Sequence, residues 1–417
     1  MAFDQEQYML QLKEKVQEGA TALTVVGSER LDPTAPDHTT IRLTFEGTGS
    51  QAPHPNDFIT VRWRNIPDAV DRFLEDIDED PERIISIDTF SSPLYPGGRE
   101  TLPLRAALME HLEIQTTGPE LLKKYGLNSI VDHNIEQRQQ LLAYHAMAEA
   151  REPADYSQYV DTTQEVFLPS LLPHMTGDDR SIERLLEYQP RIAYRPYTMS
   201  DFRRIDSTRF QAEITVSVVQ KELAAADGSS VDAFGRATSY LASLQAGDTT
   251  HGFILPDRHR FPQSSGHHVP LIIFATGAGI AGPMSMLRAG YQGGPLWIIY
   301  GVRTWEHNHL YGPELQSYLH DGTVTRLDIA ESRPSSQSKP REYVTDIIKQ
   351  NTVELMDWLN RGAHVFLCGR LSMGVSVNRA IMDLLIQSRQ CPDNNAAHLQ
   401  LQSWYDEQRF QASVSRI

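Results

Sequence analysis

The sequence predicts a protein that combines an antiparallel β-barrel carrying a helical insertion with a following α/β domain built on a parallel sheet. Three observations lead to this fold class. Short apolar runs alternate with segments of helical period in the last third of the chain. Two separated stretches before it show the alternation typical of β-strands. The residues between those two stretches have helical character.

The α/β domain is predicted from four apolar runs of strand length. Strands that are buried on both faces of a parallel sheet read as continuous apolar runs, and helices connect them. A long amphipathic stretch, REYVTDIIKQNTVELMDWLNRG, ends at Gly362, and glycine is a common helix stop. We therefore expect a nucleotide-binding α/β domain over residues 265–417. Its predicted strands are LIIFAT (271–276), LWIIY (296–300), RLDIA (326–330) and HVFLC (364–368).

The barrel is predicted from strand-like segments on both sides of a helical region. An antiparallel barrel over residues 1–99 and 191–264, interrupted by a helical insertion over 100–190, accounts for this order. The strand-like segments are ALTVVGSERL, TTIRLTFEG and DFITVRW near the start, and FQAEITVSVVQ and HGFILP after the insertion. The helical segments are LPLRAALMEHLEI, PELLKKYGL, NIEQRQQLLAYHAMAEA and SIERLLEY.

Composition excludes several classes of function. A chain of 417 residues is longer than one hydrophobic core usually organises, so two or three packed units are expected. The formal net charge of -16 disfavours binding to nucleic acid or to anionic membranes. Two cysteines, Cys368 and Cys391, fit a reducing compartment and have no metal-ligand spacing. No signal sequence or intrinsic membrane segment is evident, so we expect a cytoplasmic protein.

The segment Arg195-Pro196-Tyr197-Thr198 is a candidate flavin site. On an extended strand, Arg195 can neutralise a pyrophosphate, Tyr197 can stack on the isoalloxazine and Thr198 can hydrogen-bond near the flavin N5. Without its context, the tetrapeptide is better described as an ordinary strand with an exposed arginine and a half-buried tyrosine.

A second candidate begins at Gly235, where Gly235, Ala237 and Thr238 lead into an apolar helix. Backbone N–H groups and hydroxyls at a helix N-terminus suit a pyrophosphate. Plain helix capping by Thr238 or Ser239 is the alternative.

A glycine-rich loop with Gly277 and Gly279 follows a predicted strand and opens a helix, which is the context of a dinucleotide-phosphate site. Cys368 ends the predicted strand HVFLC, so it lies either beside a nicotinamide or simply in the core.

The segment that follows the strand RLDIA contains a candidate site for the 2′-phosphate of NADPH. It consists of four residues, two of them arginines, and guanidinium groups bind phosphate well. The alternative is a solvated basic loop. The four residues are Ser332, Arg333, Arg341 and Tyr343.

In this order and spacing, the motifs resemble the ferredoxin–NADP reductase superfamily, and more narrowly the reductase portion of the diflavin reductases. The resemblance covers nearly the whole chain. It rests on RPYT, GRATSYL, TGAGIAG, HVFLCG and the run from YGVRTWEHNHLYGPELQ to ESR.

The resemblance implies two cofactors, FAD and NADPH. It implies that the residues of RPYT bind the flavin side of FAD and that Gly235, Ala237 and Thr238 hold its pyrophosphate. Gly277, Gly279 and Arg303 would line the NADPH path, and the basic cluster would grip the 2′-phosphate. Thr198, Cys368 and Ser413 would lie at the reacting centre, and the helical insertion would be the family's connecting domain.

The chain departs from the family pattern mainly in the NADPH half. The family ends in an aromatic residue that covers the flavin, with an acid two residues before it, whereas Ser415 and Ser413 take these places here. Ala278 replaces a customary threonine, and Arg370 follows Cys-Gly where an aspartate is common. Whether Trp404, Tyr405 or Phe410 covers the flavin in place of the lost ring stays open at this point.

Three functions follow as hypotheses. The first is an NADPH-dependent FAD oxidoreductase that passes electrons to a separate redox protein or a small molecule, since the chain is expected to lack a flavodoxin domain. The second is a reductase fold reused for a biosynthetic reaction on a small molecule in the flavin crevice. The third is a non-catalytic scaffold.

Overall fold

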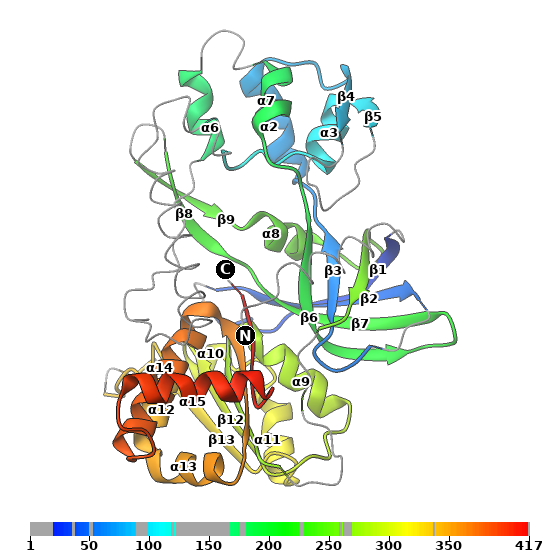
Figure 1. Cartoon of the computed structure of the whole chain (residues 1–417). Coiled ribbons are helices and arrows are strands. Elements are labelled where there is room, and N and C mark those ends of the chain that lie inside the picture. Colours follow the sequence, from blue (N-terminus) through cyan, green and yellow to red (C-terminus); the bar gives the residue numbers. More distant parts are fainter. Residues whose placement is uncertain are drawn as a thin grey trace.

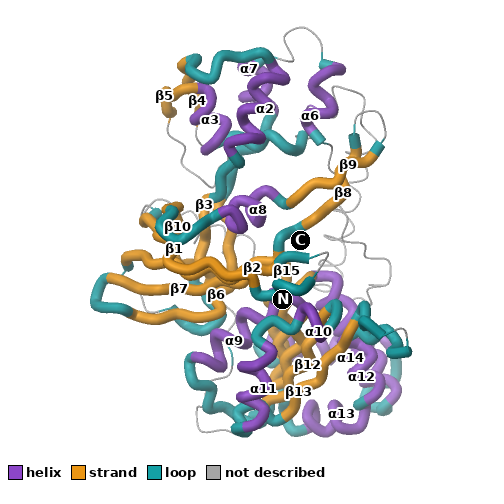
Figure 2. The backbone as a smooth tube through the Cα atoms, turned by 180° about the vertical axis from the view of Figure 1, so that it is seen from behind, coloured by secondary structure: helices purple, strands orange, loops and turns teal. Residues whose placement is uncertain are grey.

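The computed structural model describes residues 20–35, 38–49, 53–88, 99–117, 121, 167–175, 181–225, 229–257, 261, 269–336 and 338–415. The described parts form three tiers (Figure 1), with the helical insertion at one end, the barrel in the middle and the α/β domain at the other end. The view from behind shows the same order (Figure 2). The predicted fold class is therefore confirmed.

The middle tier is a closed barrel of six strands in the order β1-β10-β3-β6-β7-β2, with every neighbouring pair antiparallel. Alternate residues of its strands, such as Leu23, Phe45 and Ile214, fill the interior. The strands are β1 (Thr21–Arg30), β2 (Thr40–Thr48), β3 (Phe58–Arg62), β6 (Tyr194–Arg204), β7 (Arg209–Ser217) and β10 (Thr249–Leu255). Beside them lie helix α8 (Arg236–Ser243) and a hairpin of β8 (Gln220–Ala224) and β9 (Ser230–Phe234).

The insertion tier has its own small apolar core. It contains α2 (Pro67–Ile77), β4 (Ile84–Asp88), β5 (Arg99–Pro103), α3 (Leu104–Glu110), α6 (Leu168–Leu171), η2 (Leu172–His174) and α7 (Ile182–Tyr188). The predicted helical segments PELLKKYGL and NIEQRQQLLAYHAMAEA lie almost wholly outside the described residues. The domain boundaries proposed from the sequence stay a prediction.

The α/β tier is a five-stranded parallel sheet in the order β13-β12-β11-β14-β15. All four apolar runs predicted as strands are strands. The strands are β11 (Leu271–Thr276), β12 (Leu296–Val302), β13 (Arg326–Glu331), β14 (His364–Arg370) and β15 (Phe410–Ser415). The helices are α9 (Ala281–Arg288), α10 (Trp305–Asn308), α11 (Gly312–His320), α12 (Val344–Gln350), α13 (Thr352–Asn360), α14 (Leu371–Gln387) and α15 (Asn394–Asp406).

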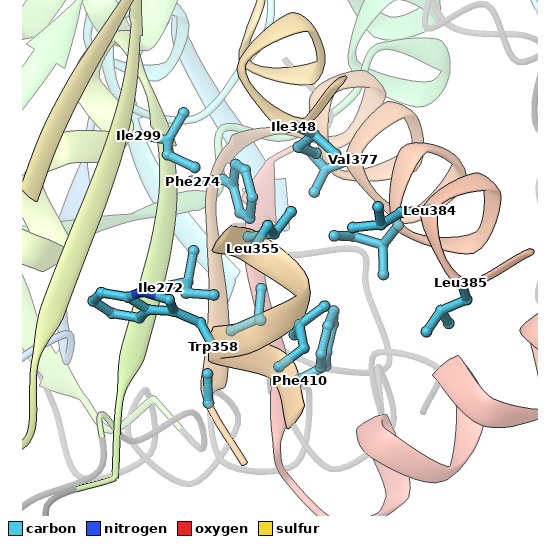
Figure 3. Packing of buried hydrophobic residues seen from close by; sticks show 14 of the residues in the cluster. Ile272, Phe274, Ile299, Ile348, Leu355, Trp358, Val377, Leu384, Leu385 and Phe410 are labelled. Atoms are coloured by element: carbon cyan, nitrogen blue, oxygen red, sulfur yellow. The ribbon is translucent and has the colours of Figure 1, made fainter. Parts of the chain in front are cut away.

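Successive residues of the central strands alternate between two cores. Ile272 and Phe274 face α12 to α15, where Leu355, Trp358 and Phe410 pack against them (Figure 3). Leu271, Ile273 and Ala275 face α9 and α11 on the other side of the sheet. The amphipathic stretch ending at Gly362 is two helices, α12 and α13, because the chain leaves the helical conformation at Asn351. No helix in the described part of the chain is long and apolar enough to cross a membrane.

Candidate active site

The order of the parallel strands creates a topological switch point, where we place the candidate crevice. From the central strand β11 the chain proceeds to β12 and β13 on one side and returns to β14 and β15 on the other. In open α/β sheets, ligands bind at such a switch point, beyond the carboxyl ends of the strands. The loops after β11 and β14 flank this place.

The glycine loop after β11 is one turn of 3₁₀-helix, η4 (Gly277–Ile280), that leads directly into α9. Gly277 has a positive φ of 53°, and a Cβ placed on it would meet nothing within 4 Å. A Cβ placed on Gly279 would lie 2.5 Å from the carbonyl oxygen of Cys368. The loop is therefore open at Gly277 and in close backbone contact with the end of β14 at Gly279.

Cys368 lies on the α9 side of the sheet and is 3% exposed. Burial, with the nearby charge of Asp257 adding to it, raises the pKa of its thiol well above the ordinary value. The side chain is therefore a neutral thiol. Ser413 is directly opposite it in the β14–β15 register and is half-buried. Ser415 is opposite Arg370, and its side chain lies outside the described part of the structure.

The RPYT segment lies on β6 and pairs with β3, with Thr198 opposite Phe58. Arg195 is exposed, whereas Tyr197 and Thr198 are half-buried. Burial raises the pKa of Tyr197, so its hydroxyl stays protonated. The barrel and the α/β domain meet here, because α9 packs against β6 (Figures 1 and 2).

The contact between the two domains is close at Gly282 of α9. A Cβ placed on Gly282 would lie 2.5 Å from Asn56 Oδ1 and 3.6 Å from Thr198 Cγ2. Two motifs that are about 80 positions apart in the sequence, RPYT and the glycine loop, thus lie at one junction.

Two buried residues at this junction were missed by the sequence analysis. Asn56, with a positive φ of 78°, donates from Nδ2 to Asp257 Oδ2 at 2.6 Å. Asn56 is fully buried and its Oδ1 has no hydrogen-bond partner. The Asp257 backbone N–H donates to Asp57 Oδ1 at 2.9 Å. Only the turn-forming PND sequence marked this place, and turns alone do not indicate a site.

The second candidate motif begins α8. The Thr238 hydroxyl donates to the Gly235 carbonyl at 2.9 Å and accepts from Val219 N–H at 3.1 Å. That hydroxyl ties the first turn of α8 to Val219, but it does not cap the helix, because the N-cap is Gly235 and no side chain caps it. Ser239 Oγ, one residue on, is buried without a hydrogen-bond partner. Ala237 is half-buried beside the barrel core.

The predicted 2′-phosphate cluster lies at the carboxyl end of β13. The loops after β12 and β13 are tied together, since Arg333 N–H donates to the Arg303 carbonyl at 2.7 Å and Ser332 Oγ donates to the Val302 carbonyl at 3.2 Å. Arg333, Arg341 and Tyr343 are exposed. The Glu342 N–H donates to the Glu331 carbonyl at 2.8 Å, so the neighbouring residues Arg341 and Tyr343 also lie near the end of β13.

Glu331, a carboxylate that the sequence analysis did not single out, lies beneath this cluster. It accepts from Trp305 N–H at 2.6 Å and is paired with Lys339. Burial alone would raise its pKa, but Lys339 and the Trp305 N–H lower it. Its charge is therefore neutralised locally.

The aromatic residues near the C-terminal end do not take the place of the flavin-covering aromatic residue that ends the family's chains. The rings of Trp404 and Phe410 stack with their centres 5.0 Å apart and an interplanar angle of 18°. Both are buried in the core between the sheet and helices α12 to α15. Phe410 is opposite Val365 at the amino end of β14, so it lies at the end of the sheet away from the crevice. The Tyr405 hydroxyl bonds Asn378 Oδ1 at 3.0 Å.

Comparison with known proteins finds a match for part of the α/β domain. Residues 273–379 match the family described as the oxidoreductase NAD-binding domain. These residues include the glycine loop, the basic cluster and Cys368.

The chain also matches sulfite reductase [NADPH] flavoprotein alpha-components. One from Vibrio cholerae is 26% identical over 402 residues, covering 88% of this chain and 59% of that protein. One from Bacillus subtilis is 23% identical over 385 residues, covering 90% and 57%. One from Shewanella sp. strain ANA-3 is 26% identical over 301 residues, covering 70% and 45%.

The chain spans about half the length of the curated relatives it matches. The resemblance to flavoprotein reductases predicted from the motifs is confirmed by these matches. The predicted cofactors agree with the words NADPH and flavoprotein in the names of these relatives.

Proposed function

We propose that this chain is an NADPH-dependent FAD oxidoreductase that passes electrons from NADPH through FAD to a separate redox protein or a small-molecule acceptor. The observation that carries the proposal is the junction of β6 and α9, where Thr198, the glycine loop and Cys368 meet beyond the switch point of the sheet.

The residues present fit both cofactors. At the first turn of α8, Ser239 Oγ is a buried hydroxyl without a partner, and it lies beside N–H groups that favour an anion. The glycine loop leaves open space at Gly277. Arg195 is exposed at the barrel surface, as expected for a group that neutralises phosphate.

When bound, FAD would supply a two-electron acceptor for reduced nicotinamide that can also give up its electrons one at a time. The chain's own residues would bind the cofactors and orient them. Tyr197 supplies an apolar ring with a protonated hydroxyl, and Thr198 supplies a hydroxyl at the junction. Cys368 supplies a small neutral side chain that excludes water from the end of β14. Ser413 supplies a hydroxyl beside it.

Specificity for NADPH is assigned to Ser332, Arg333, Arg341 and Tyr343. The guanidinium groups would bind the 2′-phosphate, and Arg303, whose carbonyl accepts from the Arg333 N–H, is assigned to the NADPH path. The Glu331 charge, which would oppose an anion, is neutralised by Lys339.

The test is an anaerobic titration of the purified, FAD-loaded protein. NADPH is expected to bleach the flavin absorbance much faster than NADH. Protein that holds FAD but is never bleached by either nucleotide would overturn the proposal. Protein that cannot be loaded with FAD would support the scaffold hypothesis instead.

A second function is favoured by one observation. From Gln411 to Val414, the described side chains of β15 beyond Phe410 include no aromatic ring, and Ser413 takes the place beside Cys368. This arrangement suits a small-molecule substrate that reaches the flavin directly. A Ser415→Trp variant should block such a substrate while sparing a protein acceptor. Unchanged turnover of the small molecule would count against it.

A further inference from the structure

A partly buried charged cluster joins the barrel to the α/β domain about two residues beyond Thr198. Its centre is Glu213 of β7, whose side chain is 13% exposed. Glu213 Oε1 accepts from the Ser200 hydroxyl at 2.7 Å and from Arg288 Nη1 of α9 at 2.5 Å. One carboxylate oxygen therefore binds a barrel strand and an α/β helix at the same time.

On the barrel side, Glu213 holds a β-bulge. The β6–β7 register shifts between Met199, opposite Ile214, and Asp201, opposite Glu213. Ser200 is the extra residue and is fully buried. A bulge redirects the strand that carries it, so the hydrogen bond from Ser200 to Glu213 sets the course of β6 immediately after Thr198.

On the other side, Glu213 meets two elements of the α/β domain. Arg288 ends α9, the helix that starts at the glycine loop, and its guanidinium lies 4.8 Å from the centre of the Tyr311 ring. The Tyr311 hydroxyl lies 3.3 Å from Glu213 Oε1 and 2.6 Å from Thr215 Oγ1. Burial raises the pKa of Tyr311 to about 12, so this hydroxyl remains protonated.

Arg288 also binds Glu314 of α11, from Nε at 2.9 Å and from Nη2 at 2.7 Å. That pair lies within the α/β domain, whereas the pair with Glu213 crosses between domains. Arg42 Nε, 3.5 Å from Glu213 Oε2, completes a cluster of two carboxylates and two guanidiniums. Removing the Glu213 charge would leave the partly buried Arg288 with its carboxylate partner in the α/β domain alone, so the charge pairing between the two domains would be lost.

We propose that Glu213 is a positioning residue that locks α9, and with it the glycine loop, against the strand that carries Thr198. The consequence for catalysis rests on the proposed function, because the lock fixes the nicotinamide side of the crevice relative to the flavin side. A displacement of about 1 Å between reacting groups costs as much as roughly 100-fold in rate.

The two carboxylates of Arg288 provide a matched pair of variants in the full-length protein. Glu213→Gln removes the charge that crosses the domains, whereas Glu314→Gln removes the charge within one domain. Amide hydrogen exchange of peptides covering 194–200 and 281–288 reports on the lock without any cofactor. We expect Glu213→Gln to speed exchange in both peptides by about tenfold. Glu314→Gln should leave 194–200 unchanged.

Equal exchange in wild type and Glu213→Gln would overturn the proposal, as would an effect of Glu314→Gln on both peptides. Should Glu213→Gln fail to fold, Tyr311→Phe removes a single hydroxyl from the same carboxylate and should raise exchange in both peptides to a smaller extent. No rise in that variant would equally refute the lock.

With FAD bound, Glu213→Gln should slow flavin bleaching by NADPH about tenfold at saturating nucleotide, with little change in the affinity for NADPH. Glu314→Gln should slow it less than about threefold. If the wild type is never bleached, the proposed function fails. The exchange experiment still decides whether Glu213 holds α9 against β6. If the wild type is bleached and both variants match it, the lock has no role in catalysis.

Discussion

Gly279→Ala offers a sharp test of where the nucleotide lies. The added Cβ would lie 2.5 Å from the Cys368 carbonyl oxygen, 2.7 Å from its carbon and 2.8 Å from Gly369 N. All three are backbone atoms at the end of a central strand, so no side chain can move aside. Relief requires the glycine loop to shift by about 1 Å to reach ordinary contact distance.

The expected cost has two parts. Overpacking of this kind lowers the free energy of unfolding by about 1–3 kcal/mol. A shift of about 1 Å in the loop should reduce the rate of flavin reduction by NADPH roughly 10- to 100-fold. FAD binding should change little, since the atoms that the added Cβ would strike belong to β14 and not to the barrel motifs.

Gly374→Ala is the matched control. Gly374 lies in α14 just after the same strand, and a Cβ there would meet Val414 Cγ1 at an ordinary 3.4 Å. Alanine in a helix favours stability by about 0.5–1 kcal/mol over glycine. Stopped-flow absorbance gives the reduction rate and urea unfolding gives the stability. A Gly279→Ala protein that is reduced as fast as Gly374→Ala would refute the placement of the nucleotide at this loop.

Three further predictions concern other parts of the site. Replacing both Arg333 and Arg341 by alanine should weaken binding of 2′,5′-ADP about 10- to 100-fold in calorimetry, and unchanged affinity would remove the cluster from the 2′-phosphate site. Cys368 should react with iodoacetamide at pH 8 only after unfolding, because burial raises the pKa of its thiol; labelling of the native protein would contradict this. Asn56→Ala should be about 1 kcal/mol less stable than Asn56→Gly, since both lose the bond to Asp257 but only alanine is strained at a φ of 78°; equal urea midpoints would count against that reason.

The parts of the fold that were predictable are those where burial decides the local pattern. The runs at 271–276 and 364–368 are apolar throughout because both faces of the parallel sheet are covered. The short hairpins β4–β5 and β8–β9 were not predicted as separate sheets. In β4–β5 the strand Arg99–Pro103 is largely exposed and has mixed polarity, so no core-facing period marks it.

Some residues of the candidate site could likewise be predicted from the sequence, and others could not. Gly277, Gly279 and Thr198 belong to local motifs in which a few adjacent residues carry the chemistry. Asn56 and Asp257 are 201 positions apart and make their contact only through the fold. Glu213 and Arg288 likewise come from different domains, and each resembles an ordinary surface charge in its own segment. No periodic pattern in the sequence indicates such pairs.

The most direct test of the proposed function is the anaerobic reduction of the FAD-loaded protein by NADPH and by NADH, followed in wild type and in Gly279→Ala. The account predicts complete bleaching of the wild-type flavin, a strong preference for NADPH, and a rate at least about tenfold lower in the variant. A flavin that stays oxidised with both nucleotides, or one reduced equally fast in both proteins, would contradict it.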